Sequence, residues 1–310
     1  MKEYLKNRIY IAGQQGMVGS AIRNLLKKIG YKIIECSRSE LDLTCQKSVS
    51  KWFKKKTPDI VINAAGKVGG ILDNQKNKSD YIYTNTIIGF NLLNASINNN
   101  VKQFINLGSA CIYPKKTKQP VKENQLLTSS LEESNEGYAL AKISVLKYCE
   151  YIYYSHNKKY ISLMPANLYG AGDNFNLQTS HVIAALVKKF HYAKINNKSY
   201  VEVWGSGKPR REFLHTTDLA SAVVFCLKNE INNPYLNVGG GTCFTIKNLA
   251  EKIKKITQFK GKISFNKKFP DGVKQRKLDD SKIRMLGWKP LVKFDEGLAQ
   301  YYLDFKDILK

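Results

Sequence analysis

The first half of the chain alternates short apolar runs with longer segments of helical periodicity. Strands that alternate with helices in this way indicate βαβ units, and therefore a parallel sheet that is buried on both faces. The predicted strands are Arg8–Ala12, Lys32–Glu35, Asp59–Ala64, Gln103–Leu107 and Ser162–Pro165. The predicted helices are Met17–Ile29, which ends at Gly30, Val49–Lys55, Tyr81–Asn98 and Tyr138–Tyr154.

The alternation becomes looser after Tyr169. The predicted elements there are the helices Val182–Ala193 and Asp218–Leu227 and the strand Val201–Trp204. We expect a strand ending in Val238 to return to the main sheet, and residues 245–310 to form short helices and strands that close over its carboxyl edge. The pattern predicts an α/β protein with a doubly wound parallel sheet in residues 1–170, to which residues 214–240 return. Residues 171–213 and 241–310 would form a smaller C-terminal α/β domain for substrate.

The charge of the chain is unusual, although its composition is not. Its 310 residues are 43% hydrophobic, as in ordinary globular proteins, but 50 Lys and Arg against 25 Asp and Glu give a net charge of +25. Such a charge suits a nucleic acid, a membrane surface or an anionic small molecule. The lysines are scattered along the chain and no nucleic-acid-binding motif accompanies them. We therefore expect no nucleic-acid partner.

The cysteines and the apolar segments indicate a compartment. The six cysteines show neither a CxxC pair nor the spacing of metal ligands, so we expect no metal and no need for disulfides. Residues 1–8 are polar, which argues against a signal peptide, and no apolar stretch approaches the ~20 residues that cross a bilayer. The expectation is a soluble cytoplasmic protein without a membrane partner.

A glycine-rich loop follows the first predicted strand directly and leads into a helix. Glycines let the backbone turn tightly and approach a pyrophosphate, while the helix N-terminus offers N–H groups to it. An ordinary glycine-rich turn is the alternative, but the position between strand and helix favours a dinucleotide site on a Rossmann-type sheet. The loop consists of Gly13, Gln14, Gln15, Gly16, Met17, Val18 and Gly19.

The residues at the end of the second strand distinguish enzymes that bind NAD from those that bind NADP. An NAD enzyme usually places an acid there for the ribose hydroxyls, whereas an NADP enzyme replaces it and adds a cation. The expected acid position falls near Ser37, which is followed by Arg38, so the sequence favours the 2′-phosphate of NADP. Two alternatives stay open: Glu35 could bind the ribose if the strand is shorter, and Arg38 could be a solvated loop residue.

Tyr138 and Lys142 lie one helical turn apart and should share a helix face. A tyrosine near its reference pKa of ~10 is a poor acid–base group at neutral pH, and a nearby cation lowers that pKa. Such a pair can move a proton to or from a sugar oxygen while hydride passes to carbon. Ser109, at the end of a parallel strand, could bond the same oxygen. A similar pair, Tyr154 and Lys158, lies in a polar stretch where its helix ends, so we set it aside.

Seven strings spread over the chain resemble those of the GDP-L-fucose synthases, which belong to the extended short-chain dehydrogenases. The resemblance runs from about Ile9 to Trp288, with a shortened stretch near residues 229–234. The strings are AAGKVGGI at 64–71, GSACIYP at 108–114, NEGY at 135–138, MPANLYG at 164–170, SHVI at 180–183, VWGSG at 203–207 and REFLH at 211–215.

The resemblance implies two reactions in one site. GDP-4-keto-6-deoxy-D-mannose would be epimerised at C3 and C5 and then reduced at C4 by NADPH, which gives GDP-L-fucose. Cys111 and His181 match the family's epimerisation pair, although by themselves they would pass for a small buried hydrophobic residue and a helix cap. Protons next to a ketone are acidic because the enolate spreads charge onto oxygen, which Tyr138 and Ser109 could stabilise.

The resemblance implies a homodimer built on the helices Tyr81–Asn98 and Tyr138–Tyr154. The family's binding residues also have counterparts in this chain. The implied NADP contacts are residues 13–19, Arg38, Leu107, Gly108, Ser109, Ala110, Lys142, Pro165, Ala166, Asn167, Leu168 and His181. The implied nucleotide-sugar contacts are Lys189, Trp204, Arg211 and Asp271.

Departures from the family pattern bear on binding. Gln15 stands where an Arg commonly holds the 2′-phosphate, and Lys189 keeps the charge of a common Arg but not its bidentate geometry. Ala110 replaces a usual Ser and Gly137 a usual Pro. Other readings stay open: a GDP-4-keto-sugar enzyme that makes another deoxysugar, for instance on a heptose, an NAD-retaining UDP-sugar 4-epimerase, or a non-catalytic dinucleotide sensor.

Overall fold

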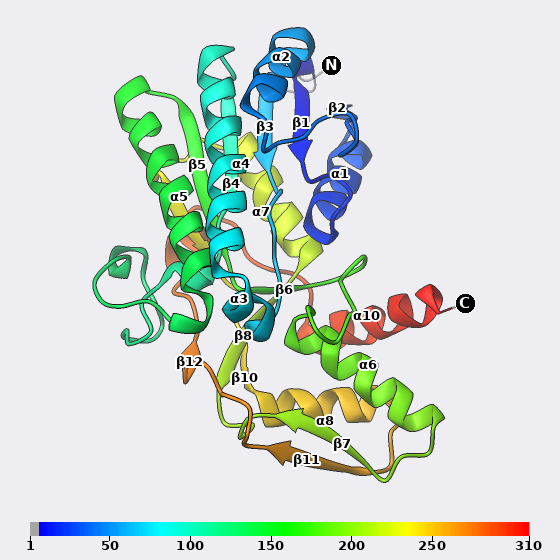
Figure 1. Ribbon diagram of the computed structural model, residues 1–310. Coiled ribbons are helices and arrows are strands. Elements are labelled where there is room, and N and C mark those ends of the chain that lie inside the picture. The colour runs from blue at the N-terminus through cyan, green and yellow to red at the C-terminus, as the bar shows by residue number, and fades with distance from the viewer. Residues whose placement is uncertain (1–5, 310) are drawn as a thin grey trace.

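The computed structural model describes residues 6–309, whose central element is a six-stranded parallel sheet (Figure 1). The strand order is β2-β1-β3-β4-β5-β9. This architecture confirms the predicted α/β class with a Rossmann-type parallel sheet. Its strands are β1 (Arg8–Ala12), β2 (Lys32–Ile34), β3 (Ile60–Asn63), β4 (Gln103–Leu107), β5 (Lys159–Pro165) and β9 (Tyr235–Val238).

Helices cover both faces of the sheet because successive strand residues point to opposite sides. Ile9 belongs to the core that includes Leu26 and Leu219, while its neighbour Tyr10 packs in the other core with Phe53 and Leu92. The first face carries α1 (Met17–Ile29) and α7 (Thr216–Lys228). The second carries α2 (Gln46–Lys56), α4 (Lys78–Asn98) and α5 (Glu136–His156).

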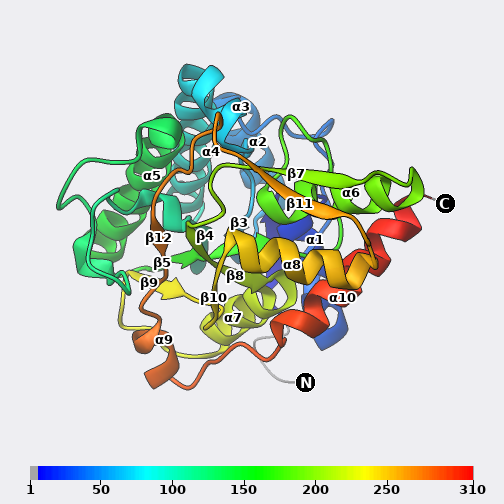
Figure 2. The same cartoon turned by 90° about the horizontal axis from the view of Figure 1, so that it is seen from below.

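A second lobe lies beyond the carboxyl ends of the sheet strands (Figures 1 and 2). Its strands β7 (Tyr200–Trp204) and β11 (Lys262–Asn266) pair in parallel. Phe190, Leu249 and Tyr301 belong to its separate hydrophobic core. The helices of this lobe are α6 (Val182–Ile195), α8 (Ile246–Thr257) and α10 (Phe294–Ile308).

A small four-stranded sheet joins the main sheet to the lobe. Its central strand, β8 (Arg210–His215), pairs in parallel with β6 (Asn167–Tyr169) and β12 (Gln275–Arg276), and antiparallel with β10 (Cys243–Thr245). Because β6 follows β5 closely, this sheet brings the end of β5 together with residues more than a hundred positions later. The remaining short elements are α3 (Ile71–Lys76), α9 (Ser281–Met285) and the 3-10 turns η2 (Ala110–Ile112), η3 (Glu123–Gln125) and η4 (Glu133–Asn135).

The expectation of only short elements in residues 245–310 is wrong for two helices. Leu249, Ile253 and Thr257 recur every four residues in α8 and are buried, so this helix continues over three turns. Lysines occupy its other face. Because lysines are frequent along the whole chain, the apolar positions of this helix did not stand out in the sequence. The helix α10 begins at Phe294 and has 15 residues.

The strand order places a ligand position at the carboxyl edge. The chain leaves β1 toward β2 on one side, whereas β3 lies on the other side of β1. Loops that diverge at such a switch point leave room for a ligand between them. The glycine loop after β1 and the segment after β3 therefore border one site.

Candidate active site

The glycine loop packs too closely for side chains at two positions. Gly13 has φ +79°, in the left-handed region, and a Cβ on it would lie 2.8 Å from the Ala64 carbonyl oxygen. A Cβ on Gly19 would lie 2.0 Å from the Gly13 carbonyl oxygen. A Cβ on Gly16 would meet an atom only at 3.5 Å. The loop is thus closed against the protein at both ends and has more room in the middle.

The start of α1 suits an anion. No side chain caps this helix, and its first turn carries no acidic residue. Gln14 is buried beside it, and its Nε2 donates a hydrogen bond to the Cys36 carbonyl, which ties the loop to the end of β2. The Gln14 Oε1 atom is buried without a hydrogen-bond partner in the described residues. These features fit a dinucleotide pyrophosphate at this helix end.

The side chains at the end of β2 differ in availability. Glu35 forms ion pairs with Arg23 and Lys27, both on α1, so its carboxylate is already engaged. Arg38 is exposed and has no ion pair or hydrogen bond within residues 6–309, and Gln15 is likewise exposed. The arrangement leaves Arg38, rather than Glu35, ready to meet a ligand phosphate.

Ser109 and Cys111 are locked together at the end of β4. The Gly108 N–H donates to the Leu163 carbonyl at 2.8 Å, which continues the sheet pairing one residue beyond β4. Ser109 then caps η2, and its Oγ accepts a hydrogen bond from the Cys111 N–H at 3.2 Å. Both side chains are partly exposed. The Ser109 hydroxyl thus holds the backbone of Cys111 at the carboxyl edge.

Tyr138 and Lys142 lie on α5 beside this segment. The Lys142 Nζ, which is buried, donates to the Leu107 carbonyl at 2.9 Å and lies 5.8 Å from the centre of the Tyr138 ring. The Ser109 side chain lies near enough to the Tyr138 phenol to influence its pKa. The structure thus brings Ser109, Cys111, Tyr138 and Lys142 together.

The expected lowering of the Tyr138 pKa by Lys142 is wrong for this structure. Burial raises the pKa of Tyr138 well above its ordinary value, the Cys111 charge adds to this, and the bond from Ser109 opposes it only in part. Burial also lowers the pKa of Lys142 to about 8. Desolvation is the largest cause of both shifts. The phenol therefore holds its proton at neutral pH.

His181 directly precedes α6. It is exposed, caps α6 without a side-chain hydrogen bond, and has no hydrogen bond or ion pair with Cys111 in the described part of the chain. The preceding loop is fixed at Asp173, which accepts a hydrogen bond from the Tyr301 hydroxyl at 2.8 Å. Its other end meets α3, where the Gly70 N–H donates to the Thr179 carbonyl.

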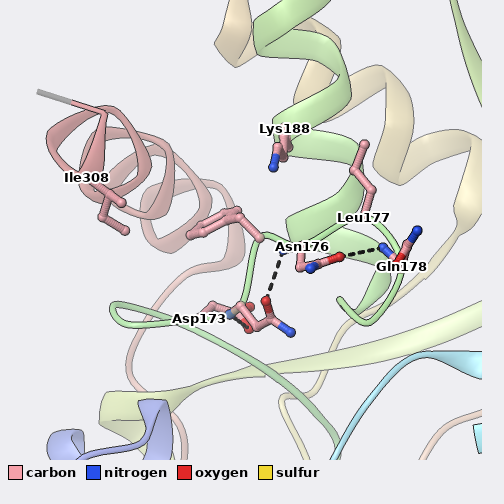
Figure 3. A pocket seen from close by; sticks show the side chains of 8 residues that line it. Asp173, Asn176, Leu177, Gln178, Lys188 and Ile308 are labelled. Atoms are coloured by element: carbon pink, nitrogen blue, oxygen red, sulfur yellow. Dashed lines mark hydrogen bonds between the residues drawn. The ribbon is translucent and has the colours of Figure 1, made fainter. Parts of the chain in front are cut away.

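Figure 3 shows this loop beside a wide hollow of about 660 Å³. The lining residues include Asp173, Asn176, Lys188 and Ile308. None of the site residues expected from the sequence lines it. We therefore do not assign the hollow to the site.

Two of the expected substrate residues form an aromatic and cationic pair. The Lys189 Nζ lies 4.7 Å from the centre of the Trp204 ring and donates to the Glu202 carbonyl at 3.0 Å. Burial lowers the pKa of Lys189, and the Glu202 charge opposes this. Trp204 stacks on Phe269 with ring centres 4.3 Å apart and planes 12° from parallel. The pair offers a flat apolar surface next to a positive charge.

Arg211 and Asp271 are joined through the backbone. Arg211 donates to the Asp271 carbonyl at 3.4 Å and to the Val273 carbonyl at 2.6 Å. The Asp271 carboxylate accepts hydrogen bonds from the Ser206 N–H and hydroxyl, at 2.6 and 2.7 Å. A Cβ on Gly205 would lie 2.4 Å from this carboxylate, so Asp271 also borders the Trp204 end of β7.

Arg276 was not among the residues predicted from the sequence. It is buried, and its two terminal nitrogens donate to the carbonyls of Tyr113 and Pro114, at 3.0 and 3.1 Å. The charge of Cys111 opposes the lowering of its pKa by burial. Nothing distinguishes it in the sequence from the surrounding lysines and arginines.

The remaining expected contacts lie where strands end. Pro165 closes β5, and the Ala166 N–H donates to the Val238 carbonyl at 3.0 Å. Asn167 and Leu168 belong to β6, and the Asn167 side chain donates to the Glu212 carbonyl at 2.9 Å. Ala110 is buried in η2. These positions all border the carboxyl edge of the sheet.

A family model matches residues 9–239, well over half of the chain, and is described as the NAD dependent epimerase/dehydratase family. The chain belongs to this family. The matched range holds every candidate described above except Asp271 and Arg276. The glycine loop and the Tyr138–Lys142 pair of this family member are therefore parts of one recognised domain.

Curated relatives of this family member include proteins named as GDP-L-fucose synthases. The Arabidopsis thaliana protein "Putative GDP-L-fucose synthase 2" is 45% identical over 95% of this chain and 90% of its own length. The GDP-L-fucose synthase of Escherichia coli K12 is 42% identical over 97% of this chain and 98% of its own. A solved GDP-mannoheptose C4 reductase from Campylobacter jejuni with NADP bound is 33% identical, with a TM-score of 0.88 over 97% of this chain and 98% of that chain.

Across residues 6–309, no helix combines the length and the apolar character that a membrane span requires. Within the same residues, no group of three or more His, Cys, Asp or Glu side chains could hold a metal ion.

The buried Lys142 ammonium should make stability depend on pH. Between its folded pKa of about 8 and its ordinary value of 10.5, the unfolded chain binds more protons, so the free energy of unfolding rises with pH. Relative to Lys142→Met, wild type should gain about 2 kcal/mol between about pH 7.5 and about pH 9.5. Urea unfolding of both proteins measures this gain, and parallel pH profiles would contradict it.

The free Arg38 guanidinium should determine cofactor preference. Arg38→Ala should raise the KM for NADPH by about tenfold and leave the KM for NADH nearly unchanged, because only NADPH carries the 2′-phosphate. Steady-state kinetics with both cofactors measures this. Lys47→Ala, which removes an exposed cation on α2, serves as the control. Equal effects of Arg38→Ala on both cofactors would exclude the role.

Proposed function

We propose that this chain is an NADPH-dependent epimerase and reductase that converts GDP-4-keto-6-deoxy-D-mannose to GDP-L-fucose. The observation that carries the proposal is the cluster of Ser109, Cys111, Tyr138 and Lys142 at the carboxyl end of β4. It lies in a chain that is 42–45% identical to proteins named GDP-L-fucose synthases.

The residues present fit NADP(H), which would supply hydride to the substrate when bound. Residues 13–19 and the uncapped start of α1 would hold the pyrophosphate, with Gln14 beside it. Arg38 would hold the 2′-phosphate. Lys142, fixed by the Leu107 carbonyl, would contact the nicotinamide ribose. The loop after β5, residues 165–168, would line the nicotinamide side.

Epimerisation needs a base and an acid on opposite faces of the sugar. A base removes the proton from the carbon next to the C4 ketone, and its bonding electrons move into an enolate. The ketone oxygen then carries negative charge, which the Tyr138 and Ser109 hydroxyls stabilise by donating hydrogen bonds. An acid returns a proton to the same carbon from the other face. We assign these two roles to Cys111 and His181, which lie on different elements, η2 and the start of α6.

Reduction at C4 requires a proton for the oxygen as hydride reaches the carbon. Tyr138 is suited to donate it, because burial raises its pKa and keeps the phenol protonated at neutral pH. Ser109 lies near the phenol and would orient the ketone. The same oxygen is thus held in both reactions by the same two hydroxyls.

The nucleotide would be bound by the second lobe. The stacked rings of Trp204 and Phe269 offer a platform for a planar base, and Asp271 lies next to it. Lys189 and Arg211 supply positive charge for the diphosphate. Because Lys189 provides a point charge rather than a guanidinium fork, we assign the directional contacts to Arg211.

A second candidate is a related GDP-4-keto-sugar enzyme that makes another sugar. The likeness to a solved GDP-mannoheptose C4 reductase over nearly the full chain favours it. Incubation with GDP-4-keto-6-deoxy-D-mannose and NADPH, followed by NMR of the product, separates the two. GDP-L-fucose as the product supports the first candidate, and turnover of a GDP-keto-heptose alone supports the second.

We also propose a homodimer through α4 and α5. Ile82, Tyr83 and Phe90 on α4 and Tyr151 and Tyr154 on α5 are exposed, although they are large and apolar. Two packed helices that expose such rings present a surface that association would bury. Symmetric pairing would place four helices together across the dyad.

We propose the cytoplasm as the compartment. All six cysteines are free, and Cys111 must stay a thiol for the role assigned to it. A reducing compartment preserves such thiols. Fractionation of cells that make the protein tests this placement.

Cys111→Ser should separate inversion from reduction. A serine hydroxyl is a far weaker acid than a thiol, so deuterium uptake from D₂O at C3 and C5 should slow. NADPH oxidation should continue, because Tyr138 is intact, and part of the product should be a 6-deoxy-D-hexose. Mass spectrometry and NMR measure both. Tyr138→Phe is the matched control: it should lose NADPH oxidation yet still bind NADPH. Unchanged deuterium uptake in folded Cys111→Ser would exclude Cys111.

Tyr83→Glu should weaken the dimer. The ring is 67% exposed on α4, so the change leaves each chain folded but puts a charge into the proposed interface. Sedimentation velocity should show wild type at twice the mass of one chain and the variant shifted toward the monomer. Tyr200→Glu, at a comparably exposed ring on β7, should leave the mass unchanged. A monomeric wild type would contradict the proposal.

A further inference from the structure

Arg276 links the second lobe to the segment that follows β4. It lies on β12, where it pairs with Arg211 of β8. Its side chain is buried and donates hydrogen bonds to the carbonyls of Tyr113 and Pro114. The planar guanidinium can serve two neighbouring carbonyls at once, which a lysine ammonium cannot do with the same geometry.

These two bonds close one end of a short segment whose other end is Ser109. Cys111 lies between them: its N–H donates to the Ser109 Oγ, and Tyr113 follows two residues later. Ser109 itself has separate anchors upstream, because the Leu107 carbonyl accepts from Lys142 and the Gly108 N–H bonds β5. Loss of Arg276 should therefore displace Cys111 more than Ser109.

Burial of the Arg276 guanidinium costs solvation free energy, which indicates that this residue has a specific role. In residues 6–309 no carboxylate forms an ion pair with it, and the nearby Glu132 is paired with Lys115 at 3.4 Å. Arg211, the neighbour across the strand pair, has the same sign of charge. The buried guanidinium loses solvation, which the two carbonyl bonds and the Glu132 charge restore only in part. An apolar side chain would fill this position at lower cost.

We propose that Arg276 is a positioning residue for Cys111: by holding the carbonyls of Tyr113 and Pro114, it sets where the thiol stands relative to the sugar during epimerisation. This inference rests on the proposed function and adds a residue to it. Arg276 acts on Cys111 through these two carbonyls.

Arg276→Lys tests the proposal, because it keeps the charge and removes the two-carbonyl geometry. Deuterium uptake at C3 and C5 should fall roughly tenfold to a hundredfold, as expected for a small misplacement of a reacting group. NADPH oxidation should fall much less, so a 6-deoxy-D-hexose should appear among the products. Arg210→Lys is the matched control, since Arg210 precedes Arg211 on β8, is exposed and donates to the Cys243 carbonyl, away from Tyr113 and Pro114.

A double-mutant cycle shows whether Arg276 acts through the thiol. In a Cys111→Ser background, Arg276→Lys should change the residual deuterium uptake by less than about twofold, because the group it positions is already gone. An equal fold-loss in both backgrounds would overturn the proposal, as would Arg276→Lys with wild-type uptake. Arg276→Gln should show the same product bias and replaces the lysine variant if that variant does not fold.

Alkylation of Cys111 gives a readout that needs no substrate. Iodoacetamide labelling at fixed pH, followed by peptide mass spectrometry, compares Cys111 with Cys45, an exposed cysteine before α2 that serves as internal reference. Arg276→Lys should raise the labelling of Cys111 relative to Cys45 roughly several-fold, because the segment that carries Cys111 becomes less rigid. An unchanged ratio would overturn the positioning role. A wild type that does not turn over the GDP-keto-sugar would instead exclude the proposed function and leave this ratio to decide on Arg276.

Discussion

The hydrogen bond from the Lys142 ammonium to the Leu107 carbonyl fixes α5 against the carboxyl end of β4. Both partners are buried, and the bond is made at the last residue of the strand. The bond fixes the position of α5, and with it Tyr138, relative to the carboxyl edge of the sheet. Ser109 follows this strand end and holds the Cys111 N–H, so the bond anchors the segment that carries both side chains beside α5. The second lobe then builds on a cluster that the main sheet has already ordered.

The site concentrates positive charge in places where water is scarce. Burial lowers the pKa values of Lys142, Lys189, Arg211 and Arg276. Cations held in this way are solvated less well than in water, so an incoming anion replaces solvation that they lack. A diphosphate and an enolate are both such anions. The high net charge of the chain would add long-range attraction to this local effect.

Local rules of strand, turn and helix were enough to predict the sheet and the position of the glycine loop. Gly13 and Gly19 lie so close to backbone atoms that a Cβ would clash, so both positions require glycine. The loop could be predicted because this requirement appears in the sequence as glycine spacing. The Tyr138–Lys142 pair was visible from its helical spacing. The pKa of Tyr138 was not, because it depends on burial that the fold creates, and sequence spacing shows only which charges are near.

Long-range pairing explains what the sequence did not reveal. Arg276 comes to Tyr113 across more than 160 positions, through the pairing of β12 with β8. The contact is invisible in a chain where basic residues are scattered everywhere. Cys111 and His181 were singled out only through family resemblance, since a lone cysteine and a histidine before a helix have ordinary structural explanations.

The register of β12 against β8 limits which sequence changes this lobe can accept. Side chains alternate along a strand, so a slip of one residue against β8 would turn Arg276 to the opposite face and bring Gln275 in its place. The loop of residues 267–274 precedes this strand and can absorb insertions or deletions, provided that the strand parity is kept. New nucleotide preferences could therefore arise by rebuilding that loop around Asp271, while the pairing that follows it holds the segment of Cys111 in place.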